Sequence, residues 1–251
     1  MRGIHRYETF GLHAAWVVGF LTEPATSRSV DYLGPRQRLA LRRYLQDAGI
    51  CDAANDLTLI GRLLSETTGD PRWSKYAWPC VWTFLCTTAP IFRWYAALPS
   101  RVWTLEELSQ AMQGTWPEVS VRTLYNARSE LLGTLRYTPI GEDLGQGIRV
   151  RSNGRDTVDK QGLERVSGYW VLFCTTVMCP RGLTISADGK GSRSSVAQVL
   201  GVDDRVLAAA LESLWQPDLC TVSRESDGLV RVRLIPGVTP ESVLQRWIAK
   251  G

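Results

Sequence analysis

The sequence predicts a mainly α-helical protein with small β-hairpins, organised as tandem winged helix-turn-helix modules. Three observations lead to this fold class. Apolar residues at helical spacing dominate the chain. A stretch that begins at residue 103 has the order helix, turn, helix, hairpin, which is typical of a winged helix-turn-helix module. A similar order returns from residue 194 onward.

Composition indicates an ordinary globular protein. The chain has 251 residues, of which 44% are hydrophobic and 22% charged, and this excludes a largely disordered chain. A net charge of +4 permits nucleic-acid binding without requiring it. The six cysteines lie in apolar stretches without CxxC spacing, which favours buried, reduced thiols. The apolar runs 14–21 and 169–179 are too short to span a bilayer, so we expect a soluble, cytoplasmic protein.

The first predicted unit, residues 1–102, is a helical domain. We expect a short apolar helix over 11–22, a loop over 22–34 and a helix over 35–48 that begins at Pro35. LTLIG (57–61) should run into a helix over 59–66. The aromatic stretch 73–98 predicts two buried helices separated near Pro90.

The helix over 35–48 carries four arginines within eight residues: Arg36, Arg38, Arg42 and Arg43. No glutamate lies at the i,i+4 spacing that would pair with them, which is unusual for a helix that is only solvated. Two interpretations stay open, a solvated face and a surface that contacts a polyanion. If all four arginines contact phosphates, binding should fall steeply with salt.

The second predicted unit, residues 103–155, is the clearest winged-helix candidate. Thr104 and Glu107 form a capping-box pattern that opens a helix over 105–113, and Ser120 should cap a helix over 121–133. Strands are expected over 135–140 and 148–152, with a polar linker over 153–162.

The second helix of this unit carries residue types suited to nucleic acid. Val121, Leu124, Ala127, Leu131 and Leu132 repeat at helical spacing and should face the core. Arg122 and Asn126 then point outward and suit base edges and phosphates. Three arginines of the expected hairpin would meet backbone phosphates: Arg136, Arg149 and Arg151. A solvated face or a protein-contact surface explains the same residues equally well.

The third predicted unit, residues 156–251, repeats the order of elements. Helices are expected over 194–200 and 204–215, strands over 219–224 and 229–235 around an Asp227-Gly228 turn, and a last helix over 240–249. The second of these helices is acidic and apolar, with Arg205 as its only basic residue. This favours a core or protein-contact role.

Signals for catalysis are sparse. The two histidines, His5 and His13, lie near Glu8 without a zincin spacing or an obvious third ligand. GKGSRSS (189–195) lacks the spacing of a phosphate-binding GxxxxGK[ST] loop. We therefore predict a non-enzymatic protein with no catalytic residue, no metal and no cofactor.

Several segments resemble an uncharacterised bacterial family, the domain of unknown function 4007 family. They are RYETFGLHAAWV (6–17), GPRQRLALRRYLQDAGI (34–50), LTLIG (57–61), WYAALPSRVWTLEELSQAM (94–112), SVRTLYNARSELL (120–132) and ISADGKGSRSSVAQVLGVDDRVLAAALESL (185–214). Tyr7 stands where the family usually has histidine. Genes of that family tend to lie near DNA phosphorothioation and phage-defence loci. The resemblance thus implies an accessory DNA-binding or assembly subunit that acts with a sulfurtransferase-like or other defence protein.

Two functions therefore follow from the sequence. The first is a non-enzymatic subunit that binds duplex DNA, with RNA or an RNA-guided complex as further nucleic-acid partners. The alternative is a protein adaptor that assembles a multiprotein or ribonucleoprotein defence complex. A continuous basic surface over Arg42, Arg43, Arg122 and Arg151 would favour nucleic acid, whereas arginines paired with acids would favour the adaptor.

Overall fold

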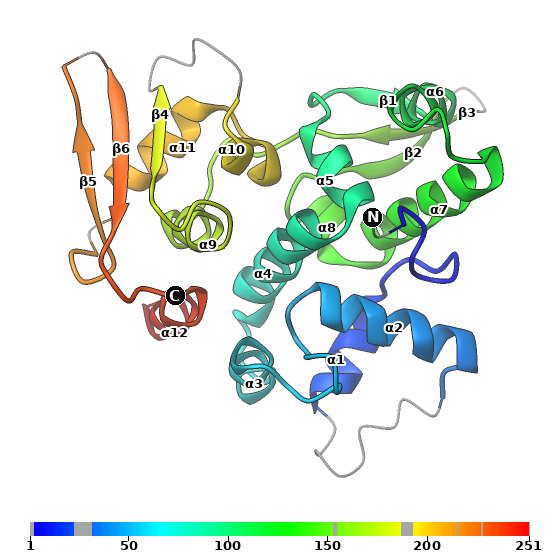
Figure 1. Ribbon diagram of the computed structural model, residues 1–251, viewed down its shortest axis with the longest axis horizontal. Coiled ribbons are helices and arrows are strands. Elements are labelled where there is room, and N and C mark those ends of the chain that lie inside the picture. Colours follow the sequence, from blue (N-terminus) through cyan, green and yellow to red (C-terminus); the bar gives the residue numbers. More distant parts are fainter. Residues whose placement is uncertain are drawn as a thin grey trace.

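The computed structural model describes residues 3–22, 32–152, 155–186, 193–214, 216–226 and 228–250. These residues form a mainly helical fold with two small antiparallel sheets of three strands each (Figure 1). None of the helices in this part of the chain is both long and apolar enough to cross a bilayer.

The N-terminal helices lie close to their predicted positions. They are α1 (Ala14–Thr22), α2 (Pro35–Asp47) and α3 (Leu59–Glu66). Pro35 occupies the first turn of α2, and the Thr58 hydroxyl caps α3 by accepting from the Gly61 amide. The first helix begins at Ala14 instead of residue 11. Most of the expected loop over 22–34 lies outside the described residues.

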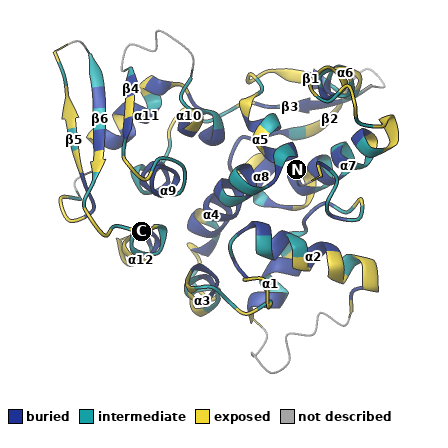
Figure 2. Cartoon of the chain, in the orientation of Figure 1, coloured by how far each residue is buried: buried dark blue, intermediate teal, exposed yellow. Residues whose placement is uncertain are grey.

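Two aromatic helices form the centre of the molecule, as the sequence predicts. They are α4 (Trp73–Thr88) and α5 (Pro90–Ala97), and Figure 2 shows them buried among the other elements. The Trp82 indole donates to the Val199 carbonyl at 2.7 Å, so the aromatic core bonds directly to the C-terminal half. A single hydrophobic cluster runs through all parts of the described chain.

The first sheet lies beyond α5. Its elements in chain order are β1 (Val102–Thr104), α6 (Leu105–Thr115), α7 (Val121–Tyr137), α8 (Pro139–Glu142), β2 (Ile148–Ser152) and β3 (Arg155–Asp159). The spatial strand order is β1-β3-β2, so β3 is central and β2 lies at the edge. The predicted capping box at Thr104 and Glu107 and the Ser120 cap are both confirmed.

Two predicted elements of this region are wrong. Residues 135–137 continue α7 instead of starting a strand, because Leu135 extends the buried stripe of Leu124 and Leu131 by one further turn. Residues 155–159 form β3, although 153–162 was expected to be a linker. Polar β3 has little strand pattern of its own, and pairing with strands on both sides makes it the centre of the sheet.

The second sheet has the same topology. Its unit comprises α9 (Gly168–Met178), β4 (Leu183–Ser186), α10 (Ser195–Leu200), α11 (Asp204–Glu212), β5 (Cys220–Arg224) and β6 (Leu229–Leu234), followed by α12 (Pro240–Lys250). The strand order is β4-β6-β5. Residues 187–192, which belong to a glycine loop expected over 187–194, lie outside the described residues, as do Trp215 and Asp227 of the expected turn.

Cysteine burial follows the sequence prediction. All six thiols are free, five of them are buried, and Cys179 is partly buried.

A buried lysine joins the first sheet to α5. The Lys160 ammonium, which follows β3, donates to the carbonyl oxygens of Tyr95 at 2.8 Å, Ala96 at 2.9 Å and Leu98 at 2.8 Å. These carbonyls lie at the C-terminal end of α5, where a helix leaves its acceptors unpaired. The Lys160 amino group supplies donors to these carbonyls, so it completes the helix end.

We predict that Lys160 makes stability pH-dependent. Burial, with repulsion from Arg193, lowers the pKa of Lys160 to about 7. An unfolded lysine has a pKa of about 10.4. Between these two values Lys160 binds a proton in the unfolded chain but not in the folded one, so its contribution to the free energy of unfolding should rise with pH across that window.

Urea unfolding at about pH 7 and about pH 8 measures this rise, because the buried cysteines, whose raised pKa values make the free energy of unfolding fall as pH rises, act mainly at higher pH. Lys160→Met should abolish it, and each carbonyl left without a donor should cost about 1–3 kcal/mol. Lys250→Met, at an exposed lysine, is the matched control. An equal pH dependence in the wild type and Lys160→Met would show that Lys160 is not responsible.

Candidate nucleic-acid interface

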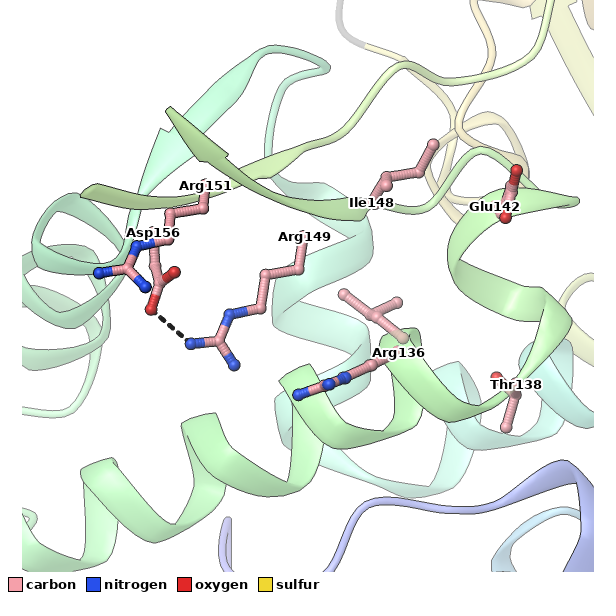
Figure 3. A pocket seen from close by; sticks show the side chains of 9 residues that line it. Arg136, Thr138, Glu142, Ile148, Arg149, Arg151 and Asp156 are labelled. Carbon is pink, nitrogen blue, oxygen red and sulfur yellow. Dashed lines mark hydrogen bonds and ion pairs between the residues drawn. The ribbon is translucent and has the colours of Figure 1, made fainter. Parts of the chain in front are cut away.

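A polar hollow of about 490 Å³ lies between the last turn of α7, α8 and the edge strand β2 (Figure 3). Three of the arginines that the sequence marks for nucleic acid line it: Arg136, Arg149 and Arg151. Arg136 comes from the last turn of α7, and the other two come from β2. Asp156 on β3 and Glu142 on α8 add two carboxylates.

Strand register explains why the two β2 arginines enter this hollow. Arg149 pairs with Val158 and Arg151 with Asp156, and paired residues share one face of an antiparallel sheet. Val158 is buried, so this is the face that packs on the helices. Because β2 is an edge strand, its residues on that face extend past the apolar core and line a hollow instead.

The hollow has more positive than negative charge at its β2 end. The Arg149 guanidinium pairs with the Asp156 carboxylate at 2.5 Å, which the dashed line in Figure 3 marks. Among the described residues, Arg136 and Arg151 lie within ion-pair distance of no carboxylate. Figure 3 places Glu142 at the opposite end from Arg151 and Asp156. Two guanidinium groups therefore remain to receive an anion.

The N-terminal half of α7 presents a mixed surface. Arg122 is exposed and Asn126 is half-buried, in keeping with their expected outward direction. Val121 was expected in the core but is 71% exposed, because it is the first residue of the helix and projects beyond α6. Tyr125 is 59% exposed beside it. Leu124, Ala127 and Leu131 are buried as predicted.

Part of the arginine helix is engaged inside the protein. Glu8 accepts from Arg43 at 2.9 Å and lies 3.5 Å from Arg36. Arg43 also donates to the Arg6 carbonyl at 2.7 Å. Arg38 and Arg42 have exposed side chains. The spacing rule for helical ion pairs could not find Glu8, because Glu8 lies far away in the sequence.

The RYETF motif anchors the N-terminal segment, residues 3–13, to α7. The buried Glu130 carboxylate accepts from the backbone amides of Tyr7 at 2.6 Å, Arg6 at 3.2 Å and Thr9 at 3.2 Å. It also bonds His5 Nδ1 at 2.7 Å. Glu8 and Thr9 adopt positive φ angles, a turn that lets three amides converge on one carboxyl group.

Tyr7, where the resembling family has histidine, points into the core. Its hydroxyl donates to Asp47 at 2.6 Å, and its ring stacks on Tyr44 at 3.6 Å. Burial and the neighbouring Asp47 carboxylate raise the pKa of Tyr7 well above its usual value, so the hydroxyl stays protonated. Tyr7 therefore acts as a hydrogen-bond donor in the core.

His5, Glu8 and His13, which lie close together in the sequence, each contact other residues in the structure. His5 bonds Glu130, Glu8 pairs with two arginines, and the His13 ring stacks between Trp16 and Tyr137. The three side chains thus have separate partners. Close backbone packing also fixes this segment, since a Cβ atom on Gly11 would lie 2.2 Å from the Gly133 carbonyl carbon.

The predicted arginines differ in their ion pairs. Arg36, Arg43 and Arg149 have carboxylate partners. All eight predicted arginines except the half-buried Arg43 are exposed. Figure 1 places α2 and α7 in the same half of the molecule, with the N-terminal segment between them. The structure therefore brings Arg136, Arg149 and Arg151 together at one hollow, while the arginines of α2 lie on a separate helix.

Comparison with known proteins gives structural neighbours. No family model matches the chain, and no curated protein does. A crystal structure of SspB is similar, with a TM-score of 0.69 and 14% sequence identity. A magnesium-ion-bound crystal structure of SspB is also similar, with a TM-score of 0.70 and 15% identity. Both alignments cover 100% of this chain and 88% of the other, so this protein shares the fold of those structures.

We predict that Glu130→Ala releases the N-terminal segment. The change leaves three backbone amides without their acceptor, so the free energy of unfolding should fall by about 3 kcal/mol or more. Urea unfolding measures the loss, and trypsin cleavage at Arg6 should become faster. Glu118→Ala removes an exposed glutamate and should change neither property. Equal unfolding midpoints for the two variants would refute the anchoring role of Glu130.

Proposed function

We propose that this chain is a non-enzymatic, DNA-binding accessory subunit of a bacterial DNA-modification or phage-defence system. The observation that carries the proposal is the gathering of Arg136, Arg149 and Arg151 around one hollow beside α7. Arginine forks match phosphate oxygens with two parallel hydrogen bonds, so such a group suits a nucleic-acid backbone. The biological setting rests on the family resemblance of the sequence.

The topology of both units supports a winged helix-turn-helix assignment. The unit of the second sheet runs helix, strand, helix, helix, strand, strand. The unit of the first sheet has the same order with the short helix α8 added before β2, and each sheet places its first strand beside its third. In the unit of the first sheet, α7 corresponds to the recognition helix and the β2–β3 hairpin to the wing. Arg122 and Asn126 would then face a groove, with the hairpin arginines on the adjacent phosphates.

The arginine helix supplies a second phosphate contact in this proposal. Arg38 and Arg42 are exposed on α2 and can reach solvent. Arg36 and Arg43 would first have to leave Glu8, so we expect them to contribute less to binding than Arg42.

A protein adaptor is the second candidate, and exposed apolar side chains on α7 favour it. Val121 and Tyr125 are 71% and 59% exposed beside a small hollow between α6 and α7. Aromatic and apolar side chains are enriched at the centres of protein interfaces. A sulfurtransferase-like or other defence protein would be the partner on this surface.

A salt titration tests the proposed DNA contact. Binding to a duplex of about 30 base pairs, followed by fluorescence anisotropy, should weaken steeply as salt rises. The double variant Arg149→Ala/Arg151→Ala should lower the slope of log affinity against log salt by about two, because each lost phosphate contact removes about one unit. Arg42→Ala alone should lower it by about one.

The control is Arg224→Ala/Arg233→Ala, which removes two exposed arginines from the β5–β6 hairpin of the second sheet. Its slope should stay at the wild-type value. No binding of the wild type at low salt, or an equal loss of slope in the control, would contradict the proposed DNA contact and favour the adaptor.

A further inference from the structure

We infer that the hollow between α7 and β2 is a binding site for a phosphomonoester, a terminal phosphate group with two negative charges. The inference rests on the proposed function in that the phosphate belongs to a nucleotide, either the end of a nucleic-acid strand or a free mononucleotide. It goes beyond that function because it specifies which kind of phosphate enters.

The size of the hollow limits which phosphate groups can enter it. Its volume of about 490 Å³ falls in the range of small-ligand pockets. A duplex is far too wide to enter it, so phosphates within an intact duplex reach only the guanidinium groups at the rim. A single terminal phosphate, with or without its sugar, fits inside.

Charge favours a group with two negative charges. Arg149 is neutralised by Asp156, whereas Arg136 and Arg151 have no carboxylate at ion-pair distance among the described residues. A phosphomonoester carries a charge between about −1.5 and −2 at neutral pH and presents three acceptor oxygens. A phosphodiester carries a single charge. The guanidinium groups of Arg136 and Arg151, which have no carboxylate partner among the described residues, match the former.

Asp156 would regulate entry by exchange of partners. Its carboxylate lies 2.5 Å from Arg149 and is paired across the strands with Arg151. A phosphate that takes over Arg149 must displace this carboxylate, and both side chains of the pair are more than a third exposed, so their ion pair is weak. Asp156 is therefore a built-in competitor of the ligand.

Isothermal titration calorimetry on the full chain tests the inference. The probes are thymidine 5′-monophosphate, its methyl phosphodiester and thymidine. The monophosphate should bind about tenfold more tightly than the diester, and Arg136→Gln/Arg151→Gln should remove that preference. Asp156→Asn should tighten monophosphate binding several-fold, an effect that a misfolded variant cannot produce. Arg224→Gln/Arg233→Gln is the control with unchanged binding.

A second arm identifies the source of the phosphate. Short duplexes with 5′-phosphate and 5′-hydroxyl ends are compared on the wild type. Preferential binding of the phosphorylated ends, lost in Arg136→Gln/Arg151→Gln, supports a strand end as the ligand. Equal binding of both duplexes with a retained preference for the monophosphate supports a free nucleotide.

Equal affinity for the monophosphate and the diester, or no binding of either, overturns the inference. In that case the inward arginines serve only to protect the edge strand from pairing with another chain. The proposed function is decided separately. If neither duplex binds, DNA binding fails, whereas duplex binding without any preference for monophosphate retains it and rejects the phosphomonoester site.

Discussion

The buried carboxylate of Glu130 is the interaction through which α7, the N-terminal segment and the arginine helix are joined. A carboxylate without exposure to solvent is stable only when hydrogen bonds replace its lost hydration, and three backbone amides and His5 do so. The amides come from residues that lack regular structure. Glu130 therefore fixes the backbone that presents Glu8 to Arg36 and Arg43 of α2.

Two partly exposed carboxylates pair with three of the candidate arginines. Glu8 pairs with Arg36 and Arg43, and Asp156 pairs with Arg149. Partly exposed ion pairs of this kind contribute little to folding stability, about 0–1 kcal/mol. In the proposed function they would act on binding, because an incoming phosphate would first have to displace these carboxylates.

The sequence was a good guide to elements with strong local signals and a poor one to contacts across the chain. Pro35, Thr104 and Ser120 marked helix starts because capping chemistry is local. Strand β3 was missed since its identity comes from neighbours on both sides. Arg149 and Arg151 were identified by residue type, but their convergence with Arg136 depends on strand register, and Glu8 and Glu130 gained their roles only through folding.

The two sheets share a topology but differ in the charged side chains along their edges. In the unit of the second sheet Arg224 lies 3.5 Å from Glu212 and Arg231 pairs with Glu225 at 3.0 Å, so carboxylates offset two of the three hairpin arginines, and Arg233 is exposed. Its second helix, α11, uses its apolar face for the core. In the first unit β2 and α7 leave two guanidinium groups facing a hollow. The two units thus share a strand order and differ in how many of their arginines pair with carboxylates, because edge-strand residues are free to change without disturbing the core.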